Sequence, residues 1–327
     1  MRILVSRTDR IGDVVLTLPL CAMLQSRLGA EVVVLGRRYT RPVLEASVHV
    51  NEVLEWDDLE TGDEARQRDF LRSARADVIV HACPRAAIAG AARAAGIPLR
   101  IGTSHRWFHW LTCNDLEHFS RKRSSLHEAQ LNVRLARRLL GDRIPTLEEL
   151  SPLTAISPRV PVPGDILKRL RDDRFSLVLH PGSNGSAREW PLSHWKVLAE
   201  SLDPARVQLL VTGSAAEGSA LGEWIATLPP DVVDLTGRLE LAQLIALLPK
   251  VDGLVAASTG PLHLAAAAGI HALGLFPATP PIHPGRWAPL GPRAEVAEAT
   301  GADLGAITPE QVRGRVAAWM DARTSRE

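Results

Sequence analysis

A run of small residues between an apolar stretch and an expected helix constrains the fold of this 327-residue chain most strongly. Ser176–Leu179 is predicted to be a buried strand, and Trp190-Pro191 is predicted to open a helix. Small residues fill the loop between them: Gly182, Ser183, Gly185 and Ser186. Amide groups and the positive dipole end at a helix start can bind an anion, and Arg188 adds a cation. An ordinary strand–helix turn without a ligand would explain the same residues.

Strands alternate with helices in both halves of the chain, which predicts α/β domains built on doubly wound parallel sheets. The region 106–125 is expected to be irregular, and Pro309–Arg323 is expected to be a helix capped by Thr308. The predicted strands are Ile3–Val5, Glu31–Leu35, Glu52–Leu54, Asp77–His81 and Arg100–Ile101 in the first half, and Ser176–Leu179, Val207–Val211, Val232–Asp234, Gly253–Ala256 and Ala272–Leu275 in the second.

A proline-rich segment, Ile144–Pro163, separates the two halves and predicts domains of residues 1–160 and 161–327. Each half opens with a strand, a loop and a helix, so a ligand is expected between them, beyond the carboxyl ends of the strands. The sequence contains neither a G-x-G-x-x-G nor a G-x-x-x-x-G-K-[ST] motif, which argues against a dinucleotide fingerprint and a P-loop.

The charge of the chain is uneven. The net charge is only +1, but Arg85–Arg143 carries eleven Lys or Arg residues and four acidic ones. For any single residue of this segment, a solvated surface position is the simplest interpretation. Aromatic residues make up 4% of the chain and no nucleic-acid-binding pattern is present, so we expect no nucleic-acid partner.

Three cysteines without C-x-x-C spacing, Cys21, Cys83 and Cys113, indicate neither a disulfide framework nor a zinc site. The apolar stretch Val14–Leu24 resembles the core of a signal peptide, but acidic residues precede it and Pro19 interrupts it. We therefore expect a cytoplasmic protein without a metal site.

Three loops at predicted strand ends carry candidate functional residues. In the first, Asp13 opens an expected helix and is interpreted either as its N-cap or as a carboxylate that takes a proton from a hydroxyl. In the second, Arg188 is a candidate phosphate partner, with Ser183 and Asn184 as neutral donors. Glu217, after another strand, is a candidate for binding ribose hydroxyls or for a surface ion pair.

The third loop is Ala257–His263, in which Pro261 suits the first position of a helix. The side chains of Ser258 and Thr259 are expected to face an anion, together with the amides of Thr259, Gly260 and Leu262. His263 is more simply explained as a packed histidine than as a catalytic one.

These segments resemble the heptosyltransferases, the ADP-heptose:lipopolysaccharide members of glycosyltransferase family 9. The resemblance rests on four motifs in order: RTDRIGDVVLTLP at Arg7–Pro19, HPGSNGSAREWP at His180–Pro191, VTGSAAE at Val211–Glu217 and STGPLHLAAAAG at Ser258–Gly269. It implies a GT-B fold, with two Rossmann-like domains facing a central cleft. The N-terminal domain would bind the acceptor, the C-terminal domain would bind the nucleotide-sugar, and the last helix would pack back on the N-terminal domain.

The resemblance implies a role for each matching residue. Asp13 corresponds to the general base, and Arg188 stands where the family commonly has a lysine that contacts the diphosphate. Ser258 replaces the usual aspartate, which leaves the transferred sugar open. The implied donor-binding residues are Arg188, Ser183, Asn184, Glu217, Ser258, Thr259, Gly260, Leu262 and His263, and the implied acceptor-binding residues are Arg7, Arg10 and Gly12.

The implied activity is inverting transfer of a heptose from ADP-heptose to the inner core of lipopolysaccharide, without a further cofactor. Two alternatives remain, a GT-B transferase for another nucleotide-sugar and a non-catalytic nucleotide-sugar binding protein. An anionic lipid acceptor would suit the basic segment. Contact with the inner face of the inner membrane is expected through an aromatic cluster with basic neighbours, Arg106, Trp107, Phe108, His109 and Trp110.

Overall fold

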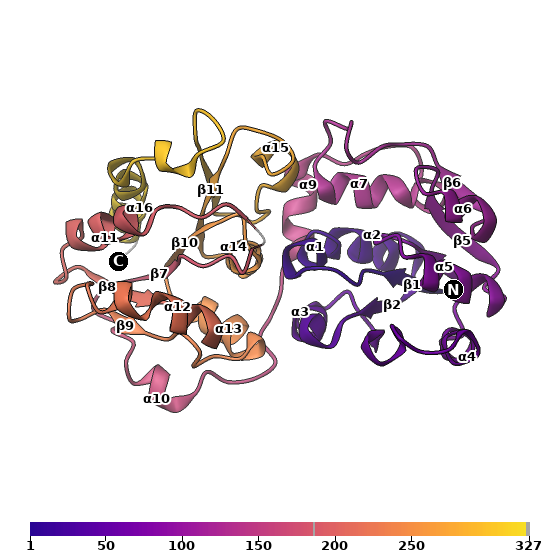
Figure 1. The fold of residues 1–327 in the computed structure, drawn as a ribbon, viewed down its shortest axis with the longest axis horizontal. Helices are drawn as coiled ribbons and strands as arrows, with labels where there is room; N and C mark the ends of the chain where they lie inside the picture. Colours follow the sequence, from indigo (N-terminus) through magenta and orange to yellow (C-terminus); the bar gives the residue numbers. More distant parts are fainter. Residues whose placement is uncertain (186, 325–327) are drawn as a thin grey trace. The chain divides into compact units, whose positions relative to one another are not determined.

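Two six-stranded parallel sheets form the framework of the structure, a computed structural model that describes residues 1–185 and 187–324. The chain divides into an N-terminal unit, Met1–Ser157, and a C-terminal unit, Pro158–Glu327 (Figure 1). The division falls inside the proline-rich segment, slightly before the expected boundary after residue 160.

The N-terminal sheet has the strand order β3-β2-β1-β4-β5-β6, and every neighbouring pair is parallel. Its strands are β1 (Arg2–Ser6), β2 (Glu31–Gly36), β3 (Glu52–Glu55), β4 (Val78–Val80), β5 (Leu99–Thr103) and β6 (Asp115–Glu117). The central strands are almost continuously apolar because helices cover both faces of the sheet. The strand order reverses between β1 and β4, and such a switch point is where doubly wound sheets bind ligands.

Helices α4 and α5 cover one face of this sheet, where Leu71 and Ile88 pack with Leu4 and Ile79. Helix α2 packs against β2 and α7 and ends at Gly29 in the left-handed conformation (φ 58°). The helices of this unit are α1 (Ile11–Val15), α2 (Leu18–Leu28), α3 (Arg41–Ala46), α4 (Glu64–Ser73), α5 (Ala86–Ala94), α6 (Trp107–Thr112), α7 (Glu128–Leu135), α8 (Arg137–Leu140) and α9 (Leu147–Leu150).

The helical stretch Ile11–Leu28 is long and apolar enough to cross a membrane by length and composition alone, with a mean hydropathy of 1.3. In the structure 61% of this stretch is buried, and Leu18, Leu20 and Leu24 are completely enclosed by the N-terminal unit. Packing in the core therefore accounts for its apolar character.

The C-terminal sheet repeats the same topology, in the order β12-β11-β10-β7-β8-β9. Its strands are β7 (Phe175–His180), β8 (Val207–Val211), β9 (Val233–Asp234), β10 (Gly253–Ala257), β11 (His271–Phe276) and β12 (Ala294–Glu298), and all neighbours are parallel. Counted from β7, the strands follow the order 3-2-1-4-5-6 of the N-terminal sheet. Its switch point lies between β7 and β10.

One face of this sheet is covered by α11, α12 and α16, which contribute Trp195, Trp224 and Val316 to a single core. Helix α14 lies on the other face, where Leu262 packs against Gly274 of β11. The helices are α10 (Gly164–Leu167), α11 (Leu192–Ser201), α12 (Ala215–Ile225), α13 (Leu241–Leu247), α14 (Gly260–Ala267), α15 (Pro284–Trp287) and α16 (Pro309–Thr324). Short 3-10 turns are formed by Arg38–Thr40, Asp57–Leu59, Ser151–Thr154, Leu248–Lys250 and Leu304–Ala306.

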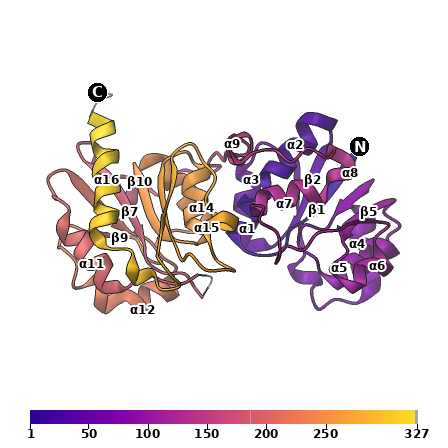
Figure 2. The ribbon, with the colours of Figure 1, turned by 90° about the horizontal axis from the view of Figure 1, so that it is seen from above.

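The last helix, α16, belongs to the C-terminal unit, in contrast to the expectation that it packs back on the N-terminal domain (Figure 2). Val312, Val316 and Trp319 lie on one helix face and are at most 3% exposed in the C-terminal core. Thr308 caps the helix as predicted, because its hydroxyl accepts the amide of Gln311 at 3.3 Å.

Three other local predictions were wrong. The single helix expected to open at Asp13 is divided into α1 and α2 around Thr17, whose hydroxyl donates to the carbonyl of Asp13. Helix α6 and strand β6 lie in the region expected to be irregular. Strand β12 was also missed, because β6 and β12 are edge strands that contain acidic residues instead of an apolar run.

Candidate functional site

In the N-terminal unit, the candidate residues follow β1 and β4 at the switch point of the sheet. The two strands pair in parallel, so their carboxyl ends lie together. Arg7 follows β1 and is only 2% exposed, and Ala82 lies just beyond β4. The Arg7 side chain donates to the carbonyl oxygen of Ala82 at 3.1 Å, which links the two loops.

The buried guanidinium of Arg7 is surrounded by three carboxylates. Its Nε lies 2.9 Å from Asp9 Oδ1, its Nη1 lies 3.4 Å from Glu128 Oε1, and its Nη2 donates to Asp13 Oδ1. Burial disfavours the charge, but the three carboxylates outweigh that cost and raise the pKa of Arg7. Arg7 is therefore a fixed cation inside the unit.

Helix α7 completes this network from a distant part of the sequence. Glu128, 1% exposed, also pairs with Arg121. The Asn132 carbonyl accepts from Arg121 Nη2 at 3.1 Å, and its amide donates to Leu16 O at 3.0 Å and Thr17 Oγ1 at 3.2 Å. The network thus fixes the junction between α1 and α2. Asp13 lies in the first turn of α1.

Asp13 is the partly exposed member of the network. Helix α1 has Arg10 as its N-cap, so the interpretation of Asp13 as an N-cap is wrong. Its side chain is 20% exposed, and one carboxylate oxygen accepts from Arg7. Burial raises the pKa of Asp13 to about 6, with Arg7 opposing the shift and Asp9 and Glu128 adding to it. A carboxylate with this pKa is suited to accept a proton near neutral pH.

The three expected acceptor-binding residues differ in accessibility. Arg10 is exposed and Gly12 is half-buried, whereas Arg7 is enclosed and occupied by carboxylates. Arg7 is thus placed to hold Asp13 and cannot present its charge at the surface. Sequence reasoning missed Glu128 and Asn132, which lie 121 and 125 positions from Arg7 in the chain.

In the C-terminal unit, the loops after β7, β8 and β10 meet at the corresponding switch point. His180 ends β7 beside Ala256 of β10, and its Nδ1 lies 2.9 Å from Thr212 Oγ1. Burial lowers the pKa of His180, so the imidazole is neutral. A Cβ atom at Gly182 would lie only 2.4 Å from Glu217 Oε1, so the glycine permits a close approach between two loops.

Ser183 closes the loop after β7 internally. Its amide and its hydroxyl donate to Glu189 Oε1 at 2.9 and 2.7 Å, and the hydroxyl also lies 3.1 Å from Ala187 O. In the absence of a ligand, the Ser183 hydroxyl is thus engaged within the loop, and its role as a ligand donor stays a prediction. Glu189, which holds this loop together, was not singled out from the sequence.

The exposed part of the same loop carries Asn184 and Arg188. Asn184 adopts the left-handed conformation with φ 46°, and Gly185 follows with φ 68°. The helix expected to open at Trp190-Pro191 begins at Leu192, so Arg188 extends from the loop itself. Ser186 lies outside the described residues.

Glu217 is a capping residue at the start of α12. Its Oε2 accepts the amide of Ser214 at 2.7 Å, and its own amide donates to Ser214 Oγ at 3.2 Å. The other carboxylate oxygen faces Gly182. Glu217 is therefore a half-buried residue beside the loop after β7, and not a surface ion pair.

The first turn of α14 follows β10. Thr259 is its N-cap and is 3% exposed, and Pro261 lies in the first turn as predicted. The amide of Thr259 donates to Ala257 O at 2.7 Å and is thus occupied, contrary to expectation. The amides of Gly260 and Leu262 belong to the first turn, which has no intrahelical acceptors.

The neighbouring side chains complete this end of α14. Ser258 is half-buried at the end of β10, and the buried hydroxyl of Thr259 has no hydrogen-bond partner among the described residues. His263 is 3% exposed and is a packed residue, as its simpler interpretation predicted.

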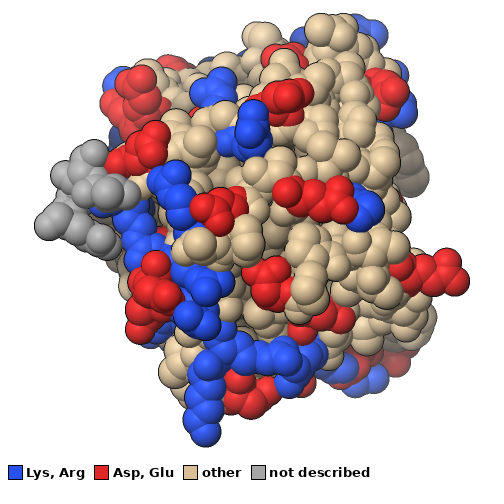
Figure 3. Space-filling model, turned by 90° about the vertical axis from the view of Figure 1, so that its left-hand side faces the viewer, with Lys and Arg blue, Asp and Glu red and all other residues tan. Residues whose placement is uncertain are grey.

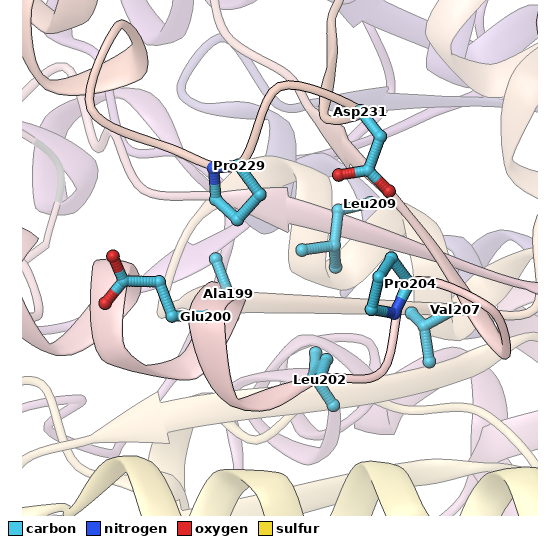
Figure 4. A pocket seen from close by; sticks show the side chains of 8 residues that line it. All are labelled: Ala199, Glu200, Leu202, Pro204, Val207, Leu209, Pro229 and Asp231. Atoms are coloured by element: carbon cyan, nitrogen blue, oxygen red, sulfur yellow. The ribbon is translucent and has the colours of Figure 1, made fainter.

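Two pockets of the described structure lie away from these loops. Figure 4 shows a hollow of about 260 Å³ near Val207, which begins β8, so it lies at the amino end of the sheet. Another of about 640 Å³ lies beside edge strand β3. Residues 1–185 and 187–324 contain no cluster of three His, Cys, Asp or Glu side chains able to hold a metal ion.

Comparisons with known proteins find a family and relatives that this chain resembles. The family model of glycosyltransferase family 9 (heptosyltransferase) matches residues 70–306. Lipopolysaccharide heptosyltransferase 2 of Escherichia coli K12 is 26% identical over 318 residues, which are 90% of this chain and 87% of that protein.

Solved structures agree on the fold. E. coli ADP-heptose LPS heptosyltransferase II has a TM-score of 0.79 at 23% identity, covering 99% of this chain and 100% of that one. E. coli heptosyltransferase WaaC with ADP has a TM-score of 0.74 at 18% identity, covering 98% and 100%. The predicted GT-B fold class is confirmed. The family match spans most of the chain, which therefore belongs to glycosyltransferase family 9, the heptosyltransferases, and is a glycosyltransferase.

Proposed function

We propose that this glycosyltransferase transfers a heptose from ADP-heptose to the inner core of lipopolysaccharide, with inversion at the anomeric carbon. The observation that carries the proposal is the carboxylate of Asp13, which is partly exposed in the first turn of α1 and has a pKa raised to about 6. Support for the substrates comes from the relatives, one named lipopolysaccharide heptosyltransferase 2 and another solved with ADP-2-deoxy-2-fluoro heptose.

Asp13 acts as the general base in this proposal. It removes the proton from an acceptor hydroxyl while that oxygen forms a bond to the anomeric carbon of the heptose. The bond from this carbon to the diphosphate breaks, and ADP carries away the electron pair. Arg7 fixes the position of the carboxylate and limits the rise of its pKa, so the base is ionised at neutral pH.

The departing diphosphate needs positive charge and hydrogen-bond donors. Arg188 supplies an exposed guanidinium that suits phosphate, and the amides of Gly260 and Leu262 supply donors at the start of α14. The buried hydroxyl of Thr259 adds another. These groups are preorganised on the C-terminal fold, so we propose that the reaction uses neither a metal nor a further cofactor.

The sugar is the least constrained part of the proposal. Ser258 provides a neutral hydroxyl at the end of β10, where the family resemblance implies a carboxylate. A second candidate is therefore a transferase for another nucleotide-sugar. Calorimetric titration with ADP-, UDP- and GDP-sugars distinguishes the two, because tighter binding of a UDP- or GDP-sugar would exclude ADP-heptose as the donor.

The acceptor in this proposal is anionic and reaches Asp13 past the exposed Arg10 and the half-buried Gly12. An enzyme acting on newly made lipopolysaccharide core would work at the cytoplasmic side of the inner membrane. We propose that location for this protein, with no nucleic-acid partner.

The variant Asp13→Asn tests the proposal directly. Removing a general base should lower turnover of ADP-heptose by about 10²- to 10⁴-fold. ADP affinity should be retained, since the donor loops lie in the other unit. Asp58→Asn, at an exposed aspartate paired with Arg38, is the matched control and should leave both unchanged. Full turnover by Asp13→Asn would refute the base, and donor binding without turnover by the wild type would favour a non-catalytic binding protein.

A further inference from the structure

Helix α6 presents an unusual apolar face to solvent. Trp107, Trp110 and Leu111 are 74%, 59% and 62% exposed, and their spacing of three and four places them on one side of the helix. We call these three residues the α6 face. Large exposed apolar side chains occur elsewhere in the described chain, as at Val48 and Leu167, but not as three within five residues.

Helix α6 is held in place by hydrogen bonds, although its apolar face is exposed. The indole Nε1 of Trp110 donates to Ser104 O at 2.9 Å, and Arg93 Nη1 donates to Leu111 O at 2.7 Å. His109, on the opposite side, is fully buried, and its Nδ1 lies 3.0 Å from the backbone of Thr103. His109 therefore does not belong to the surface cluster that the sequence suggested, and Phe108 is only half-exposed.

Helix α6 lies beside α5 at the margin of the N-terminal unit (Figures 1 and 2). The exposed arginines Arg93 and Arg106 come from these two elements and flank the α6 face. Between Asp77 and Asp115 the sequence contains four arginines and no acidic residue. The stretch of chain that carries the α6 face and its two flanking arginines thus has no acidic residue of its own.

The acidic residues of the wider basic segment do not neutralise these two arginines. Each of the four pairs with another arginine of the same segment: Asp115 with Arg138, Glu117 with Arg137, Glu128 with Arg121, and Asp142 with Arg137. The face of the C-terminal unit in Figure 3 differs, because acidic side chains lie beside the basic ones there.

From this combination we infer that the α6 face docks on the surface of a lipid bilayer that carries anionic headgroups. Indole rings are favoured at the boundary between headgroups and acyl chains, and nearby arginines attract anionic lipid. A second copy of the chain fits less well, since a two-fold contact through this face would gather Arg93 and Arg106 of both copies in one interface. The inference does not depend on the sugar, the acceptor or the catalytic base.

Vesicle sedimentation tests the inference without any substrate. The wild-type protein should bind vesicles that contain phosphatidylglycerol, bind vesicles of phosphatidylcholine alone much more weakly, and lose binding as salt is added. The double variant Trp107→Ser, Trp110→Ser should lower the partition coefficient about tenfold or more. Arg106→Gln should lower it about fivefold. Val197→Ser is the matched control, at a 50% exposed apolar residue of the other unit.

Trp107→Ser alone provides a second variant, because Trp107 is the most exposed of the three residues. It should weaken binding while the melting temperature stays at the wild-type value. The inference is overturned if the wild type ignores anionic vesicles or if the tryptophan variants bind them normally. It is also overturned if these substitutions abolish self-association of the protein and leave vesicle binding intact, which would make the face an interface between copies. None of these results bears on the proposed transfer reaction.

Discussion

Arg7 and Asp13 form an ion pair with one partner enclosed and the other open to solvent. The arginine side chain is 2% exposed and the aspartate side chain 20%. The enclosed guanidinium is also held by the carboxylates of Asp9 and Glu128, so it cannot move toward a ligand. The aspartate can exchange protons with an incoming group while its position stays fixed.

The first prediction concerns this cation. Arg7→Met removes the positive charge that opposes the rise in the pKa of Asp13, so the acidic limb of kcat/KM should move up by about one pH unit or more. Three carboxylates would lose their shared partner, and the free energy of unfolding should fall by ~3 kcal/mol or more. A pH–rate profile and denaturant unfolding measure the two effects.

Arg10→Met is the matched control, since Arg10 is exposed on the same loop. It should leave the acidic limb in place even if acceptor binding weakens. Arg7→Lys should restore part of the shift, because it returns the charge without the forked geometry. An unchanged acidic limb in Arg7→Met would show that Arg7 has only a structural role.

The wild-type enzyme should lose activity as the pH falls through about 6. The carboxylate of Asp13 must be ionised to accept a proton, and its pKa in the folded protein is raised to about 6. Below that value the rate should drop about tenfold per pH unit. The residual activity of Asp13→Asn should lack this limb, and a limb that persists in the variant would assign it to another group.

The loop after β7 should control donor affinity through Glu189. This carboxylate accepts both the amide and the hydroxyl of Ser183, and Arg188 lies next to it in the loop. Glu189→Ala should weaken ADP binding by about three- to tenfold, as expected for the loss of one or two hydrogen bonds. Calorimetry measures the change. Glu200→Ala, which removes an exposed partner of Lys196, is the control. Equal affinity in both variants would separate this loop from the donor site.

The N-terminal unit should become less stable in mild acid because of His81. This residue is 1% exposed, neither ring nitrogen has a partner among the described residues, and burial lowers its pKa to about 3, with His109 and Arg100 contributing. Between about 3 and 6.5 the unfolded chain binds a proton that the folded chain does not. The contribution of His81 to the free energy of unfolding should therefore fall by about 1.4 kcal/mol per pH unit below 6.5.

Denaturant unfolding of His81→Leu from pH 7 to pH 4.5 measures this contribution. The variant should lose less stability than the wild type over that range. Asp13 acts in the opposite direction, since its pKa is raised on folding, so comparison of the two proteins isolates the histidine. His105→Leu, at an exposed histidine, should follow the wild type. Parallel curves for His81→Leu and wild type would refute the assignment.

The sheets could be predicted because their central strands are buried on both faces and are therefore continuous apolar runs. The predicted strands Ser176–Leu179 and Val207–Val211 were found in this way, and the loops after them followed. Edge strand β12 has apolar and acidic residues mixed, so no such run marked it. Helix α6 was missed because its exposed tryptophans break the pattern of a helix with a polar outer face.

The candidate site was predictable only where its residues are close in the chain. The motifs predicted Asp13, Arg188 and Thr259 in segments that follow strands, and the structure has them in the segments after β1, β7 and β10. The partners that set their properties come from elsewhere. Glu128 reaches Arg7 across 121 positions, and that contact exists only once α7 has packed beside α2. The loop-closing contacts of Ser183 were not predicted either, because a serine in a glycine-rich loop is as able to close the loop as to bind a ligand.

The two sheets share one strand order, and each sets its chemically important loops at its own switch point. The ion-pair network around Asp13 draws every described partner from residues before Ser157, and the Ser183–Glu189 loop draws its partners from residues after Pro158. Each unit thus contains the described contacts of its own candidate residues. Under the proposed function, a gene fusion that joins the first half to the second half of a relative at this proline-rich junction should exchange donor preference as a unit.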